Sequence, residues 1–259
     1  MKVLVSIVLS GLVSLIYVAS LYVWKHRVRN DPLTMKLRFV SVTVTTGLSL
    51  LLVRMFVPHE DRQFCSLLGA CPSDFSLTDD LILPLLITAL LFLGTIVVFT
   101  DTYTWEELIQ EMRNEMFDLA FVRNYVVAPI TEETTFRAII CAFFIGTGLN
   151  KIIVLLVSAC VFAAAHSHHY FFQSVEGSED MSLSLGLFQV MYTFLFGLYS
   201  GSLYLKTGSL LTSISLHVFC NFLGFPDFDT LNSRKKYRYS TIFGLASWLI
   251  IFPMYLTMY

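Results

Sequence analysis

Ten residues in the middle of the chain, Ala128 to Arg137, combine two adjacent acids with an arginine inside a largely apolar stretch. One ionised side chain at membrane depth costs about 2.5 to 3.5 kcal/mol on insertion scales, so charges there usually mark a functional site. Glu133 and Arg137 are four residues apart, and on a helix they share a face and can pair. Glu132 points elsewhere, roughly 140° around the axis from Arg137. We therefore expect Glu132 to face a water molecule.

Two other apolar segments carry polar residues that suit acid–base or oxyanion chemistry. His166 lies near the end of one predicted helix, one turn after Phe162 on the same face. His217 and Asn221 are four residues apart on another predicted helix and also share a face. Each motif has a simpler interpretation, namely a structural ion pair, a bundle histidine or an interhelical hydrogen-bond clamp. If the chain crosses the membrane as proposed below, all these groups meet in its cytosolic half.

Metal and nucleophile chemistry are alternatives that the sequence supports less well. His166, His168 and His169 lie close together, but no carboxylate in that stretch completes a ligand set, and the zinc motif His-Glu-x-x-His is absent. No Gly-x-Ser-x-Gly elbow occurs, and no cysteine is placed beside a histidine as a nucleophile. We therefore expect no cofactor, with bound zinc as the alternative.

The composition indicates a membrane protein that positions these residues on helices. Of the 259 residues, 56% are hydrophobic and 14% are charged, against roughly 25% charged in a soluble domain. Hydropathy predicts helical spans at residues 3–24, 39–57, 81–100, 124–148, 151–171, 182–205, 208–224 and 240–258. We predict an all-α polytopic bundle of about eight spans, forming a single integral-membrane domain over residues 1–259. There is no basic patch interleaved with aromatic residues, so we expect no nucleic-acid partner.

The connections between the predicted spans add three expectations. Most Lys and Arg residues fall in cytosolic loops if the N-terminus is luminal, so the positive-inside rule favours that topology. Cys65 and Cys71 share one loop and could form a disulfide if that loop lies in an oxidising lumen. Residues 101–124 have the spacing of an amphipathic helix on the membrane surface, either a solvated connection or an entry gate. Gly197 and Gly201 form a small-xxx-small pattern that favours close helix packing.

On these motifs the sequence resembles the type II CAAX prenyl endopeptidases, within the family of CAAX proteases and bacteriocin-processing enzymes. The resemblance covers about residues 128–224 and rests on Glu-Glu-x-x-x-Arg, Phe-x-x-x-His and His-x-x-x-Asn in separate apolar helices. It implies a glutamate intramembrane protease with a catalytic core at about 120–224, accessory spans at about 3–100 and a polar cavity open to the cytosol. The implied substrates are farnesylated or geranylgeranylated CAAX proteins such as small GTPases, which would lose their last three residues.

The resemblance also implies roles for the polar residues. Glu132 would act as the general base on a water molecule, and His166 would orient that water or shuttle its proton. His217 and Asn221 would donate hydrogen bonds to the developing oxyanion. The run His-Ser-His-His at 166–169 is similar to the eukaryotic branch, which implies an endoplasmic-reticulum membrane with the active site facing the cytosol.

Glu133 and Arg137 would support catalysis, with Arg137 holding Glu133 or binding the substrate carboxylate. A competing class is a non-enzymatic membrane protein, either a transporter or a scaffold of the same fold, because intramembrane Glu, Arg and His also build proton or ion relays. A transporter would more often show an inverted repeat or paired broken helices, and the sequence shows neither.

Overall fold

The computed structural model describes residues 2–24, 30–57, 63–167 and 183–258, and within these ranges the secondary structure is helical. The helices group into two compact units, one formed by Met1–Asp74 with Ile130–Ser213 and the other by Phe75–Pro129 with Ile214–Tyr259. Each unit is described by itself below. Our expectation of a single domain over the whole chain stays a prediction.

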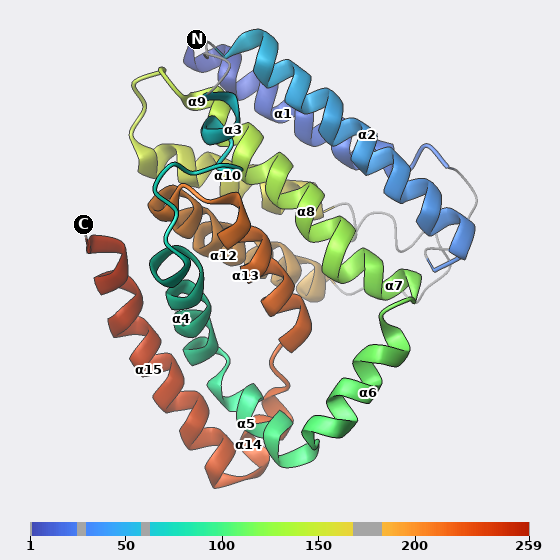
Figure 1. The fold of residues 1–259 in the computed structure, drawn as a ribbon, viewed down its shortest axis with the longest axis vertical. Coiled ribbons are helices and arrows are strands. Elements are labelled where there is room, and N and C mark those ends of the chain that lie inside the picture. Colours follow the sequence, from blue (N-terminus) through green and yellow to red (C-terminus); the bar gives the residue numbers. More distant parts are fainter. Residues whose placement is uncertain (1, 25–29, 58–62, 168–182, 259) are drawn as a thin grey trace. The chain divides into compact units, whose positions relative to one another are not determined.

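The helices of both units are labelled in Figure 1. The first unit holds α1 (Val3–Ser20), α2 (Pro32–Phe56), α3 (Gln63–Leu67), most of α8 (Ala128–Glu133), η3 (Thr134–Ile139), α9 (Ile140–Phe144), α10 (Lys151–His166) and α12 (Leu183–Thr207). The second holds η1 (Leu77–Ile82), α4 (Leu83–Leu91), α5 (Leu93–Thr102), α6 (Trp105–Glu115), α7 (Leu119–Val122), η2 (Arg123–Val127), most of α13 (Leu210–Leu223), α14 (Phe228–Ser233) and α15 (Lys235–Thr257). The η segments are π-helical.

The predicted all-α membrane fold is confirmed, and the chain is a multi-pass membrane protein. Each predicted span has a helical counterpart, and among the described residues α1, α2, α12 and α15 are long and apolar enough to cross a bilayer alone. The third predicted span differs from expectation, because α4 and α5 meet at Phe92 with a bend of 81°. Together they would make a fifth span, while α10 and α13 are shorter apolar helices. The count of about eight spans stays a prediction.

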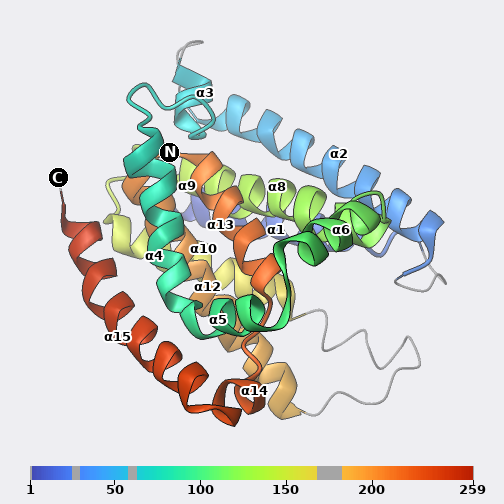
Figure 2. The same cartoon turned by 60° about the horizontal axis from the view of Figure 1, so that its bottom comes forward.

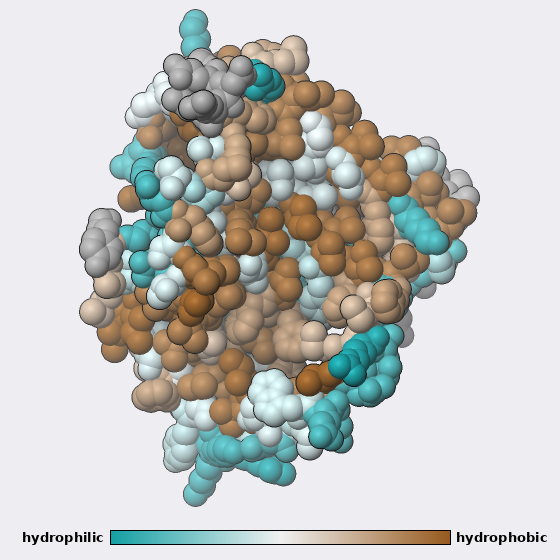
Figure 3. All heavy atoms as spheres, viewed as in Figure 1, coloured by the Kyte–Doolittle hydropathy of each residue, from teal (hydrophilic) through white to brown (hydrophobic). Residues whose placement is uncertain are grey.

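Helix α1 has the opposite distribution of side chains from a helix of a soluble protein, because its polar face is buried and its apolar face is exposed. Ser6, Ser10, Ser14 and Tyr17 are buried along one face. Large aliphatic side chains, which are Leu4, Val5, Ile7, Val8, Leu12 and Leu15, are exposed on the rest of the surface. Small and hydroxylated residues let helices approach closely and bond to one another in lipid. The outer surface of the neighbouring α2 is likewise largely apolar (Figure 3).

The first unit is held together by close helix approaches. A Cβ on Gly197 of α12 would lie 3.1 Å from the Ala159 Cα of α10, so the predicted role of this glycine in packing is confirmed. The disulfide between Cys65 and Cys71, which the sequence left open, is present and joins α3 to the loop that follows it. Gly69, in that loop, has a left-handed φ of 66°, and its carbonyl accepts a hydrogen bond from the Leu210 amide.

In the second unit α4 and α15 lie side by side, as Figure 2 shows. The approach is close because Gly244 of α15 faces the backbone of Leu90. Within the stretch 101–124, helix α6 shows the predicted mixture of exposed apolar residues, which include Trp105 and Ile109, and acids, but it covers only Trp105–Glu115. The position of α6 on the membrane surface stays a prediction. Its first turn is closed by a capping box, in which Thr104 and Glu107 bond reciprocally.

Candidate active site

The two glutamates lie on a helical run that is not regular α-helix. Helix α8, which carries both, is preceded by the π-helical η2 and followed by the π-helical η3. Pro129, the second residue of α8, has no amide proton and cannot bond to the carbonyl of Tyr125 within η2. Single π-helical turns are rare and occur frequently at functional sites. The local backbone therefore places the acids on a short α-helical turn between two widened ones.

Glu133 and Arg137 form the ion pair predicted from their spacing. The Arg137 Nε lies 3.2 Å from the Glu133 Oε2, and both side chains are fully buried. Ser200 of α12 donates a hydrogen bond of 2.8 Å to the same carboxylate. The Arg137 guanidinium also stacks over the Phe162 ring, at 4.3 Å from its centroid. Because Arg137 has no accessible surface, its contacts are suited to holding Glu133 and the helices around it.

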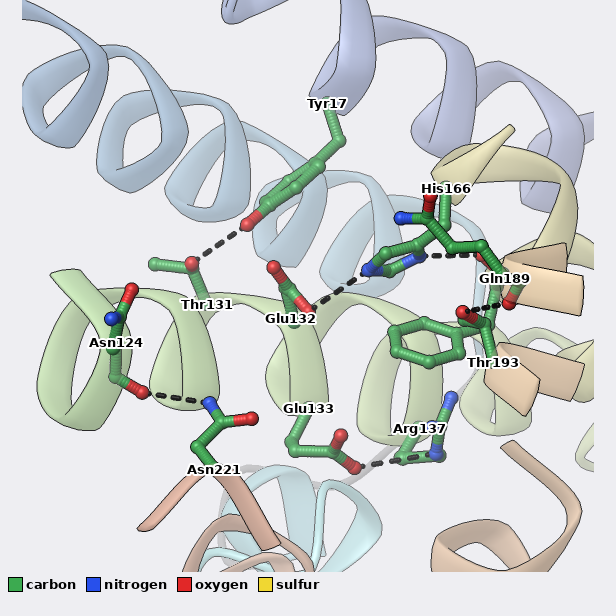
Figure 4. A network of polar contacts seen from close by, with 11 residues as sticks. Tyr17, Asn124, Thr131, Glu132, Glu133, Arg137, His166, Gln189, Thr193 and Asn221 are labelled. Atoms are coloured by element: carbon green, nitrogen blue, oxygen red, sulfur yellow. Dashed lines mark hydrogen bonds and ion pairs between the residues drawn. The ribbon is translucent and has the colours of Figure 1, made fainter. Parts of the chain in front are cut away.

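Glu132 points to the opposite side of the helix, toward His166 (Figure 4). The Glu132 Oε2 lies 3.5 Å from the His166 Nε2, and the two side chains keep 17% and 20% of their surface exposed. This differs from the fully buried Glu133, which is one residue away. The separation exceeds the roughly 2.7 to 2.9 Å of a tight charge-assisted hydrogen bond, so the pair can still rearrange around a ligand.

The other ring nitrogen of His166 determines how this pair shares a proton. Nδ1 lies 2.8 Å from the carbonyl oxygen of Phe162, and a carbonyl can only accept, so Nδ1 carries a hydrogen. A neutral ring with that tautomer presents a bare Nε2 to Glu132. Two acceptors repel each other, so the contact is favourable when one proton lies between the carboxylate and Nε2. The geometry is compatible with general acid–base chemistry.

A line of aromatic rings in contact, edge-on or tilted to one another, supports His166 from within the first unit. Phe162 lies 4.3 Å from His166 between ring centroids, Phe136 lies 5.2 Å from Phe162, and Tyr17 of α1 lies 5.5 Å from Phe136. The Tyr17 hydroxyl reaches Thr131, which directly precedes Glu132, at 2.8 Å. Tyr17 and Ser200 were not among the predicted site residues. Tyr17 belongs to no motif, and Ser200 lies within a glycine pattern that we interpreted only as packing.

His217 and Asn221 lie on α13, within the second unit. His217 is buried, and the Asn221 amide donates a hydrogen bond of 2.8 Å to the carbonyl of Asn124 in η2. The two residues are four apart on one helix, as expected. Their joining Glu132 and His166 in one reaction stays a prediction.

The residues expected as possible metal ligands are only partly covered by the structure. Within the ranges it describes, no three His, Cys, Asp or Glu side chains gather as a metal site. His168 and His169 lie outside those ranges.

The chain is thus a multi-pass membrane protein whose helices carry an acid–histidine pair of the kind that acid–base catalysis uses. Residues 114–223 match the family described as Type II CAAX prenyl endopeptidase Rce1-like. The chain is 33% identical over 242 residues to CAAX prenyl protease 2 of Homo sapiens, covering 81% of this chain and 68% of that protein. It is 28% identical over 251 residues to Probable CAAX prenyl protease 2 of Schizosaccharomyces pombe, covering 92% and 88%. It is also 26% identical over 243 residues to CAAX prenyl protease 2 of Arabidopsis thaliana, covering 84% and 77%.

The chain therefore belongs to the type II CAAX prenyl endopeptidase family. No solved structure matches it. These comparisons give no support to the transporter or scaffold alternative.

Proposed function

We propose that this protein is a glutamate-dependent intramembrane endopeptidase that removes the last three residues of prenylated CAAX proteins. The observation that carries the proposal is the part-exposed Glu132–His166 pair. The neighbouring Glu133, in contrast, is fully buried and paired with Arg137. The names of the relatives support the substrate class. Farnesylated and geranylgeranylated proteins such as small GTPases are the expected partners.

In the proposed reaction, Glu132 takes a proton from a water molecule while the water oxygen attacks the carbonyl carbon after the prenylated cysteine. A carboxylate and an imidazole at 3.5 Å can pass that proton between them. His166 then delivers a proton to the departing amine as the carbon–nitrogen bond breaks. Glu132 and His166 thereby complete one proton cycle, and the proposed scheme assigns no step to a metal.

The remaining polar residues serve the same reaction in the proposal. His217 and Asn221 donate hydrogen bonds to the oxyanion of the tetrahedral intermediate, each worth about 2.7 to 4 kcal/mol by analogy with other oxyanion holes. Glu133 and Arg137 support catalysis by fixing the helix that carries Glu132, since both are fully buried and bonded to each other. The proposed location is the endoplasmic-reticulum membrane, with the active site on the cytosolic side.

The test measures cleavage of a farnesylated C-terminal peptide beside its unprenylated twin, using the full chain in detergent micelles or vesicles. Glu132→Gln and His166→Ala should each lower turnover by at least about a hundredfold, the lower range of general acid–base contributions. Glu111→Gln, which changes an acid of α6, serves as the matched control and should cleave normally. Near-normal turnover by Glu132→Gln would refute the glutamate-dependent mechanism. Loss of activity on chelation that only zinc restores would favour the metal alternative.

A further inference from the structure

We propose that Tyr17 and Thr131 form a positioning pair that sets the orientation of Glu132 toward His166. This inference rests on the proposed function, because it assigns Glu132 the role of base. It extends the working site to α1, which lies more than a hundred residues before Glu132 and outside the segment 114–223 that matches the family.

The contact itself joins two buried hydroxyl groups across two helices. The Tyr17 Oη and the Thr131 Oγ1 are 2.8 Å apart, and only 6% and 5% of the two residues' surfaces are exposed. A buried tyrosine hydroxyl needs a hydrogen-bond partner, and lipid cannot supply one. Thr131 is the residue directly before Glu132, so the bond fixes the turn of α8 from which the base projects (Figure 4).

Helix α8 has a specific need for such a lateral bond. It is a six-residue helix between two π-helical segments, so its own backbone ladder is interrupted on both sides. A small rotation of this turn would move the Glu132 carboxylate relative to the His166 ring. Because that contact is already 3.5 Å long, a further displacement would remove it from hydrogen-bonding range.

Tyr17 also acts on the other member of the acid–base pair. Its ring packs against Phe136 in a T-shaped contact, and Phe136 packs on Phe162. The Phe162 ring contacts the His166 ring at a tilt, and the Phe162 carbonyl accepts the hydrogen bond from His166 Nδ1. One side chain of α1 therefore contacts the supports of both Glu132 and His166, which is the property required of a positioning residue.

The experiment is a double-mutant cycle on turnover with Tyr17→Phe, Thr131→Val and the double variant. Each single change removes one hydroxyl while keeping the shape of the side chain. An interhelical hydrogen bond in a membrane is worth enough to change a rate by about 3- to 15-fold, so each should lower kcat by that factor and leave KM within about twofold. If the two hydroxyls act through one bond, the double variant should lose no more than the larger single loss.

Two controls separate positioning from general destabilisation. Tyr255→Phe makes the same chemical change in the second unit, where the hydroxyl donates to the Asp79 carbonyl at 2.8 Å, and it should leave kcat unchanged. Thr131→Ser keeps the hydroxyl and should retain kcat within about twofold. If Tyr17→Phe does not insert and fold, the comparison of Thr131→Val with Thr131→Ser decides the question by itself.

Three results would overturn the positioning pair. These are an unchanged kcat in both single variants, losses that multiply in the double variant, or an equal loss in Tyr255→Phe. Glu132→Gln, assayed in the same experiment, distinguishes failure of the proposed mechanism from failure of the positioning role. If Glu132→Gln cleaves normally, the mechanism itself fails, whereas an inactive Glu132→Gln beside a fully active Tyr17→Phe refutes only the positioning role.

Discussion

The adjacent acids Glu132 and Glu133 should differ sharply in what they contribute to stability, although they are neighbours of the same type. In Glu133→Gln, the Arg137 guanidinium keeps its charge but loses its counter-ion at a position with no accessible surface. Breaking a buried pair by removing one partner costs about 3 to 5 kcal/mol. In Glu132→Gln the lost partner is a part-exposed histidine at 3.5 Å, a contact of the kind worth roughly 0 to 1 kcal/mol.

The measurement is the midpoint of unfolding when a denaturing detergent is titrated into micelles of the folded protein. Glu133→Gln should unfold at a much lower fraction of denaturing detergent than the parent chain, and Glu132→Gln should unfold close to it. A third variant, Glu133→Gln with Arg137→Met, removes both charges and should recover most of the lost stability, since replacing a whole buried pair by apolar groups is often neutral or favourable.

Equal unfolding midpoints for Glu132→Gln and Glu133→Gln would contradict the predicted difference in stability. A double variant, Glu133→Gln with Arg137→Met, that is no more stable than Glu133→Gln alone would contradict it as well. Either outcome would mean that the Glu133–Arg137 contact does not carry an uncompensated buried charge when it is broken.

Two further predictions concern packing and pH. Gly197→Ala places a Cβ 3.1 Å from the Ala159 Cα and should destabilise the first unit by about 1 to 3 kcal/mol, whereas Gly47→Ala on α2 meets nothing within 4 Å and should not. The backbone amide and the hydroxyl of Thr104 both donate hydrogen bonds to the Glu107 carboxylate, and these bonds lower the pKa of Glu107. The stabilisation of α6 by this cap is therefore fully present above the pKa of glutamate in the unfolded chain. It is lost as the pH falls through the lowered pKa of Glu107. The protection of the α6 amides, corrected for the intrinsic pH dependence of exchange, should therefore fall in acid. Glu107→Gln should reduce that dependence, and a corrected protection that does not change with pH would contradict the prediction.

The parts of the site that sequence alone could predict are those set by distance along one helix. Glu133 and Arg137 pair because residues four apart face each other, and this survives even though η3 begins between them. Phe162 and His166 contact each other for the same reason. The opposite direction of Glu132 also follows from helical geometry.

The parts that sequence could not predict join residues distant along the chain. Tyr17 and Thr131 are 114 residues apart, and Ser200 and Glu133 are 67 apart, so only the tertiary packing determines these bonds. Tyrosine and serine are also common in such helices and carry no pattern that would mark them. Their discovery required knowing which face of α1 and of α12 is turned inward.

Hydropathy could not predict the bend within the third predicted span. It measures composition and registers residues 81–100 as one apolar run, but it contains no information on backbone direction. The bend at Phe92 leaves α5 packed against α15, where Gly94 lies directly against Thr241. Such a close approach depends on a partner some 150 residues later in the chain.

The inward-facing hydroxyls of α1 have a consequence for how the protein is made. Ser6 donates to the Phe143 carbonyl, and Tyr17 bonds to Thr131, so these two hydroxyls of α1 find their partners only after α8 and α9 have been synthesised. The first unit can therefore complete these bonds only after its later helices have been made.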